Sequence, residues 1–293
     1  MPKRINRALE LLESGQPVYY TGTRELTYEN GMSMSKTWAD YINVDMEHGP
    51  FDPRGLREFM KGLVDGGPTA SGHRTPTVIC TLPTDGSSAE VVRANAWQMQ
   101  QVLARGVHGI LLCHAENAGA ATALVEACRY PFNTIGIGEG LSDGRRGGGG
   151  QASAAEIWGV PVNEYLRKAD TYPLNPEGEL LLGLKIENRR ALVHCEASTR
   201  VPGLSFAEWG PGDMGMAFGY IDRHDPPYPP EMEAARSRIK AACDDAGLFF
   251  LNAASPETIV ELIDEGVKIV ATGKGGEEVA IRGRAHTNRQ MPV

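Results

Sequence analysis

Residues 181–187 read Leu-Leu-Gly-Leu-Lys-Ile-Glu, a short apolar run that turns charged at its end. Such a run is typical of a strand buried on both faces, as in the parallel sheets of α/β proteins. Similar runs recur along the chain. Together they predict strands at Val18–Thr21, Tyr41–Asp45, Thr77–Thr81, Gly109–Cys113, Leu181–Ile186, Ser205–Trp209, Gly247–Leu251 and Lys268–Thr272.

Helical segments separate these runs. After the second run, Asp52 is a natural N-cap and Pro53 suits the first helical position, and apolar residues then recur at helical spacing over 56–63. Strands that alternate with helices predict a parallel sheet, and eight such units predict a single (β/α)8 TIM barrel. We expect one domain over 1–293, with the barrel at about 6–275 and a C-terminal tail at 276–293. A doubly wound sheet is the alternative, but no G-x-G-x-x-G follows the first strand.

Composition narrows the class of protein. The 293 residues carry a formal net charge of −8, which argues against nucleic-acid and anionic-membrane partners. No apolar run is long enough to span a bilayer, and no apolar segment follows the basic N-terminus as in a signal peptide. The 5 cysteines form no C-x-x-C pair, which predicts free thiols and a cytoplasmic location. A soluble enzyme is expected.

Polar residues end several of the predicted strands, where barrel enzymes carry their active sites. Glu187 and Asp213 are carboxylates at neighbouring strand ends, which suits Mg²⁺ or Mn²⁺, although a helix cap or a salt bridge would explain either one. His48 follows Asp45 and Glu47 and is a candidate general base or an ordinary structural histidine.

Five segments in order along nearly the whole chain resemble the motifs of one family, the HpcH/HpaI metal-dependent class II pyruvate aldolases. The segments, with the family motif after each, are Asp45–His48 (D-x-E-H), Gly144–Gly147 (G-x-R-G), Leu184–Glu187 (V-Q-I-E), Trp209–Met214 (I-G-P-A-D-L) and Val267–Gly273 (F-V-A-V-G).

The resemblance implies a set of site residues. Glu187 and Asp213 would hold a divalent metal, Mg²⁺ or Mn²⁺ with Co²⁺ and Zn²⁺ as further options, and His48 would be the base. Backbone N–H groups around Gly212 and Asp213 would receive the substrate carboxylate. Arg146, in the glycine-rich loop at 144–150, would bind substrate; the alternative is that this segment is simply a mobile surface loop. The metal would stabilise the enolate left by carbon–carbon cleavage.

Two departures from the family pattern concern charged side chains. Cys80 stands where the family has an arginine at the end of strand three, and Ala104 stands where it has an aspartate that assists the histidine. A thiol cannot replace the fixed charge of a guanidinium. Lys185, where relatives often have glutamine, His114 at the fourth strand end, or both are therefore predicted to stabilise charge at the reacting oxygen.

The expected function is a metal-dependent carbon–carbon lyase that cleaves a 4-hydroxy-2-oxo acid to pyruvate or another 2-oxo acid plus an aldehyde. Decarboxylation or β-keto cleavage at the same site is an alternative, because the arginine is missing. A Schiff base on Lys185 and a barrel that only binds a carboxylate ligand are further alternatives. The resemblance also implies a homo-oligomer, a hexamer or trimer, that exchanges a terminal helix between subunits. The aldehyde half of the substrate is not predicted.

Overall fold

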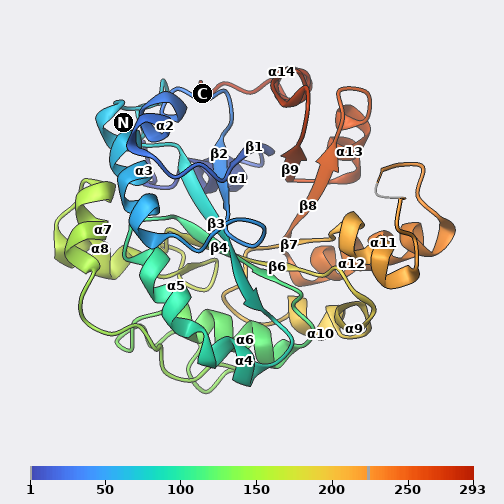
Figure 1. Ribbon diagram of the computed structural model, residues 1–293, viewed down its shortest axis with the longest axis horizontal. Helices are drawn as coiled ribbons and strands as arrows, with labels where there is room; N and C mark the ends of the chain where they lie inside the picture. The colour runs from blue at the N-terminus through green and yellow to red at the C-terminus, as the bar shows by residue number, and fades with distance from the viewer. Residues whose placement is uncertain (1, 223–224) are drawn as a thin grey trace.

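The strands of the protein close into a barrel. The structure, a computed structural model, describes residues 2–222 and 225–293 (Figure 1). Neighbouring strands pair in parallel, and the pairing of β4 with β6 and of β9 with β1 closes the ring, while β5 adds two residues beside β6. The predicted TIM barrel is confirmed. The strands are β1 (Val18–Thr23), β2 (Tyr41–Asp45), β3 (Thr77–Asp85), β4 (Gly109–Cys113), β5 (Thr171–Tyr172), β6 (Leu180–Lys185), β7 (Phe206–Glu208), β8 (Phe249–Ala254) and β9 (Ile269–Thr272).

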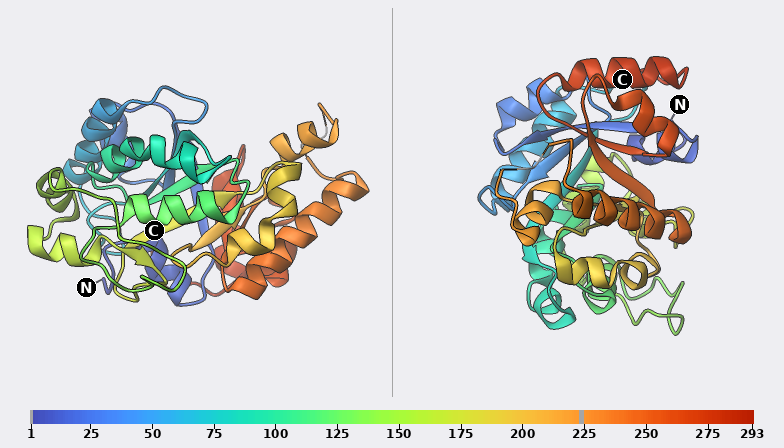
Figure 2. Two further views of the ribbon diagram at one scale, coloured as in Figure 1. Left: turned by 90° about the horizontal axis from the view of Figure 1, so that it is seen from below. Right: turned by 90° about the vertical axis from the view of Figure 1, so that its right-hand side faces the viewer.

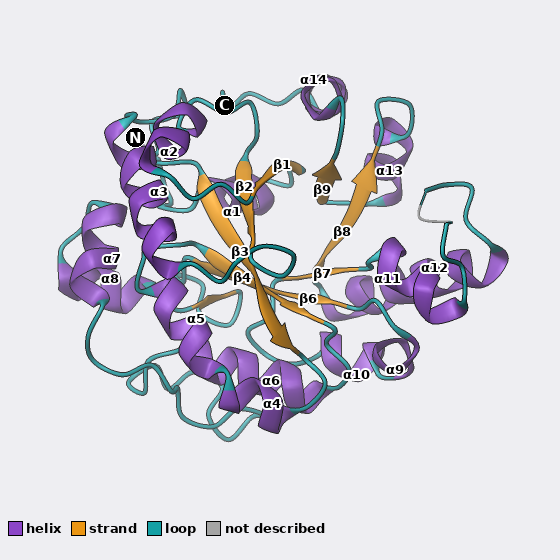
Figure 3. Ribbon diagram, in the orientation of Figure 1, coloured by secondary structure: helices purple, strands orange, loops and turns teal. Residues whose placement is uncertain are grey.

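Helices surround the strands, as Figures 2 and 3 show. No helix in the described ranges is both long and apolar enough to cross a membrane. The helices are α1 (Arg7–Glu13), α2 (Tyr28–Met34), α3 (Pro53–Asp65), α4 (Ala89–Ala94), α5 (Ala96–Leu103), α6 (Ala118–Cys128), α7 (Gln151–Trp158), α8 (Val162–Lys168), α9 (Arg189–Val193), α10 (Cys195–Thr199), α11 (Pro211–Phe218), α12 (Pro230–Ala246), α13 (Ile259–Glu265) and α14 (Gly276–His286).

Element boundaries follow local chemistry. The carboxylate of Asp52 accepts a hydrogen bond from the N–H of Gly55 at 2.8 Å, so α3 begins where its cap and Pro53 predict. Strand β8 begins later than the sequence predicts. Gly247 ends α12 in the left-handed region, with φ of 69°, so strand β8 begins only at Phe249 rather than at Gly247.

The interior of the barrel is apolar at its base and polar at its mouth. Alternate strand residues point inward and pack on one apolar face of α1, which closes the end of the barrel where the strands begin. At the other end the inward positions change to polar residues such as Asn43, Thr81 and Lys185. The closed base leaves the mouth as the place for chemistry. The inward apolar residues are Val18, Tyr41, Ile79, Leu111, Leu181, Phe206, Leu251 and Ile269.

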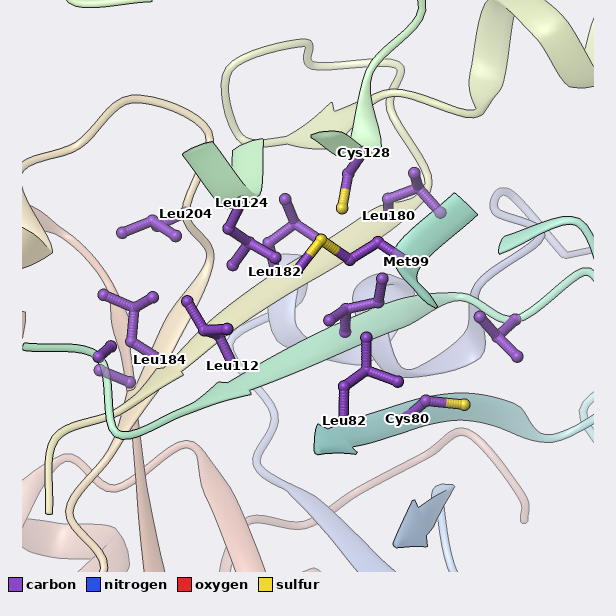
Figure 4. Close-up of a cluster of buried hydrophobic side chains, with 14 of the residues drawn as sticks. Cys80, Leu82, Met99, Leu112, Leu124, Cys128, Leu180, Leu182, Leu184 and Leu204 are labelled. Atoms are coloured by element: carbon purple, nitrogen blue, oxygen red, sulfur yellow. The ribbon is translucent and has the colours of Figure 1, made fainter. Parts of the chain in front are cut away.

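The outward-facing strand residues form the second layer of the core. Figure 4 shows Cys80 and Leu82 of β3 beside Leu112, Leu182 and other residues of this layer, which lies between the strands and the helices. Cys80 is fully buried there, and burial raises the pKa of its thiol. The cysteine therefore belongs to the packing between barrel and helices.

A buried acid anchors the C-terminal segment to the base of the barrel. Asp40, which precedes β2, contacts the guanidinium groups of Arg7, Arg284 and Arg289 at 3.2, 3.1 and 2.6 Å, and it accepts the N–H of Tyr19 at 3.0 Å. Burial opposes the charge of Asp40, but the arginines outweigh burial and lower its pKa. Part of the expected tail, 276–286, is thus helix α14, packed on its own barrel.

Candidate active site

Acidic, histidine and lysine side chains gather at the mouth of the barrel, where β2, β4, β6 and β7 end. A cavity of about 110 Å³ opens among them. The alternation of strand residues puts Lys185 and Glu208 on the inward faces of neighbouring strands, where they are register partners. The cavity is lined by Tyr20, Asn43, Asp45, Glu47, His48, Thr81, Leu111, Lys185 and Glu208.

Lys185 joins two carboxylates. Its ammonium lies 2.7 Å from Oε2 of Glu47 and 3.0 Å from Oε2 of Glu187. Burial lowers the pKa of Lys185, but the charges of Glu208, Glu187 and Glu47 outweigh burial and raise this pKa above its ordinary value. Lys185 is therefore a fixed positive charge at the mouth of the barrel.

The carboxylate of Glu187 is fully buried, and burial raises its pKa against the opposing effect of Lys185. Its Oε1 accepts the backbone N–H of His114 at 2.9 Å. Its Oε2 is buried and pairs with the ammonium of Lys185 at 3.0 Å, and it accepts no hydrogen bond from the other described residues. A carboxylate oxygen has a second lone pair, so this oxygen can also be a ligand for a cation.

Glu208 is a site residue that the sequence interpretation missed. It lies inside the barrel, where burial raises its pKa to about 7; Lys185 opposes this rise, and the charges of Glu187, Glu47 and Asp213 add to it. The signal was present, because Glu208 is two residues after the inward-facing Phe206 in a run that was already predicted as a strand.

His48 is held by the side chain of Asp45. Nδ1 of His48 lies 3.2 Å from Oδ2 of Asp45, and the Nε–H of Arg24 donates to that oxygen at 2.8 Å. Oδ1 of Asp45 accepts the backbone N–H groups of Glu47 and His48. Burial raises the pKa of Asp45, but these hydrogen bonds outweigh it and lower the pKa. The imidazole of His48 is 54% exposed beside the cavity, so Nε2 is the ring nitrogen left for a substrate proton.

Asp213 and Gly212 lie in the first turn of α11, which begins just after Gly210. The preceding Gly210 passes so close that a Cβ there would lie 2.4 Å from Oε2 of Glu187. Any larger residue at position 210 would displace this oxygen. Asp213 follows β7, at the end of the barrel where the strands end, and its charge adds to the raised pKa of Glu208.

The donor atoms present suit a divalent cation. Within the described residues, Glu47, His114 and Glu187 bring one ligand atom each within 4.8 Å of one another, and so do Asp45, Glu47 and His48. Asp213 is in neither group. Oε2 of Glu187 is buried, accepts no hydrogen bond and faces the turn that leads to Asp213, and by this observation the predicted pair of ligands fits a metal that would share the oxygen with Lys185.

The expected position of Cys80 needs correction. Cys80 faces the helices, so the inward place at the end of the third strand belongs to Thr81, whose hydroxyl donates to Oδ1 of Asn43 at 3.0 Å. Side chains alternate along the strand, so Thr81 rather than Cys80 occupies the inward position there. Ala104 lies at the C-cap of α5, before β4 begins.

Arg146 is not brought to the site within this chain. Its guanidinium is buried over the ring of Tyr130, and it donates to the hydroxyl of Tyr165 at 2.7 Å. Tyr165 contacts Trp158, which stacks on His108 just before β4. This is the N-terminal side of the barrel, so the predicted role of Arg146 in substrate binding has no support from its position.

A (β/α)8 barrel with an acidic centre at the carboxyl ends of its strands defines a TIM-barrel enzyme. Residues 75–280 match the model of the family described as HpcH/HpaI aldolase/citrate lyase, and the chain belongs to that family.

Similar proteins agree with this assignment. The hydroxypyruvate/pyruvate aldolase of Agrobacterium fabrum is 28% identical over 85% of this chain and 80% of its own. The 2-keto-3-deoxy-L-rhamnonate aldolase of Salmonella schwarzengrund is 27% identical over 80% of this chain and 74% of its own. A family member of known structure from Burkholderia cenocepacia, 20% identical, superimposes with a TM-score of 0.71 over 97% of this chain and 98% of its own, which shows the same fold. The chain is a carbon–carbon lyase of the aldolase class.

Proposed function

We propose that the protein cleaves a 4-hydroxy-2-oxo acid to pyruvate or another 2-oxo acid plus an aldehyde, with a divalent metal held by Glu187 and Asp213. The observation that carries the proposal is the buried carboxylate of Glu187, which pairs with Lys185, at the same end of the barrel as the exposed imidazole of His48. The two relatives named as aldolases support aldol cleavage over decarboxylation or β-keto cleavage.

The residues of the chain divide the work of such a cleavage. His48, oriented through Nδ1 by Asp45, accepts the proton of the C4 hydroxyl at Nε2. The N–H groups of Gly212 and Asp213 lie in the first turn of α11 and receive the substrate carboxylate. A divalent ion, Mg²⁺ or Mn²⁺ from the family resemblance, would supply a Lewis acid for the developing oxyanion.

Removal of the metal tests the proposal. EDTA is expected to abolish release of pyruvate from a panel of 4-hydroxy-2-oxo acids, and added Mg²⁺ or Mn²⁺ is expected to restore it. Full activity in EDTA would contradict the metal mechanism. Trapping of substrate on Lys185 by borohydride would then support the Schiff-base alternative.

The charge of Lys185 is expected to stabilise the reacting oxygen, because Thr81 leaves no cation on the third strand. Replacement of Lys185 by methionine, which has a similar length and no charge, is expected to lower kcat about 100-fold. Lys185→Arg keeps the charge but forms no Schiff base, so it is expected to keep much more activity than the methionine variant. Turnover that is unchanged in Lys185→Met would remove Lys185 from the mechanism.

Location and assembly belong to the same proposal. All 5 cysteines are buried and free, which supports a reducing compartment such as the cytoplasm. We propose a homo-oligomer, a hexamer or trimer, in which α14, packed on its own barrel, contacts a second subunit. Ile281 on α14 is 59% exposed, which supports contact of this helix with a second subunit.

A further inference from the structure

His114 stands between the two carboxylates that Lys185 joins. Nδ1 of His114 lies 3.4 Å from Oε1 of Glu187, and Nε2 lies 3.8 Å from Oε1 of Glu47. The ammonium of Lys185 contacts Oε2 of both carboxylates. The lysine and the imidazole therefore lie against different oxygens of the same two groups.

The backbone at His114 holds the imidazole in this position. His114 follows the last residue of β4 with φ of 47°, a left-handed conformation that is costly for most residues other than glycine and asparagine. In this conformation its own N–H donates to Oε1 of Glu187 at 2.9 Å, and its ring turns toward the same oxygen.

We propose that His114 is a nitrogen ligand of the metal held by Glu187, and that this ligand makes the site select zinc-like transition metals, Co²⁺ and Zn²⁺ above all, over Mg²⁺. The inference rests on the proposed function, since it concerns the ion that Glu187 would hold. Two ligands at about 2.1 Å from one ion stand about 3 to 3.4 Å apart, which matches the separation of Nδ1 and Oε1.

The charge balance supports the same selectivity. Glu47, Glu187 and Asp213 supply three negative charges, and Lys185, which pairs with Glu47 and Glu187, neutralises one of them. Mg²⁺ prefers oxygen ligands and gains little from an imidazole, whereas Zn²⁺ and Co²⁺ bind imidazole strongly. A site with one imidazole and a reduced negative charge therefore disfavours Mg²⁺ relative to these metals.

Metal binding to the full-length protein tests the inference without an activity assay. His114→Gly removes the ring and accepts the left-handed backbone, and His114→Asn is a second variant that tolerates it. Isothermal titration with Co²⁺, Zn²⁺ and Mg²⁺ is expected to show at least a 30-fold loss of Co²⁺ and Zn²⁺ affinity in His114→Gly, roughly the range seen when groups that support metal ligands are lost. Mg²⁺ affinity is expected to change by less than about threefold.

The visible absorption of bound Co²⁺ gives a second readout, because its intensity and position change when a nitrogen ligand is lost. His286→Ala is the matched control: its imidazole pairs with Asp264 on the surface, and its Co²⁺ affinity and spectrum are expected to equal the wild type. Wild-type affinity and spectrum in His114→Gly would overturn the inference and leave the metal at Glu187 intact. A wild-type protein that binds none of these ions would overturn the proposed metal function as well.

Discussion

Replacement of Glu187 by glutamine is expected to lower kcat/KM by at least about 1,000-fold, because a neutral amide cannot hold a divalent cation as a carboxylate does. The carboxylate is buried, its Oε2 pairs with Lys185, and no carbon could be added to Gly210 without displacing this oxygen. The amide has nearly the same shape, so the N–H of His114 keeps an acceptor. The measurement is steady-state pyruvate release together with a metal titration.

Glu177→Gln is the control for this change. Glu177 is exposed in the turn before β6, and its replacement is expected to leave kcat/KM within about twofold of the wild type, as for ordinary surface substitutions. Activity of Glu187→Gln near the wild-type level, with its far-ultraviolet circular dichroism unchanged, would exclude Glu187 as a metal ligand required for turnover.

Replacement of Asp40 by asparagine is expected to cost about 3–5 kcal/mol of unfolding free energy, because it leaves buried guanidinium groups without their counter-charge. Arg7 and Arg289 are almost wholly buried against Asp40. Urea unfolding of the two proteins at neutral pH measures the difference. A change below about 1 kcal/mol, the value of an exposed ion pair, would show that the cluster contributes little.

The same acid predicts a pH dependence. The folded-state pKa of Asp40 lies below its unfolded value, so its contribution is present above the unfolded pKa of about 3.9 and is lost as the pH falls through the folded pKa. Wild-type stability should therefore fall in that acidic range more steeply than that of Asp40→Asn. Asp264→Asn is the control, since Asp264 is 65% exposed in its pair with His286.

The fold was predictable because its strands are short apolar runs between helices, a pattern that depends on local chemistry. The sequence did not show which side chains of a strand point into the barrel and which point toward the helices. Cys80 and Thr81 are adjacent, and nothing in an all-apolar run tells which of them faces inward. Glu208 shows the converse: once Phe206 was known to face inward, the carboxylate two residues later followed.

The site was predictable where its residues end strands, as His48, His114, Lys185 and Glu187 do, because the barrel brings all strand ends together. Their pairwise contacts were not predictable. The placing of Lys185 between Glu47 and Glu187 depends on strand register across the ring and on rotamers. Arg146 belongs to a long connection, where position depends on packing against Tyr130 and Tyr165 rather than on strand order.

The plug that α1 forms at the base of the barrel has a kinetic consequence. With that end sealed, both fragments of a cleaved substrate share a single exit. Under the proposed function, the oxo acid would bind at the fully buried Glu187 and the aldehyde beside the exposed His48, so the aldehyde would leave first. The two products would then leave in a fixed order, and accumulated oxo acid would compete with incoming substrate for the empty enzyme.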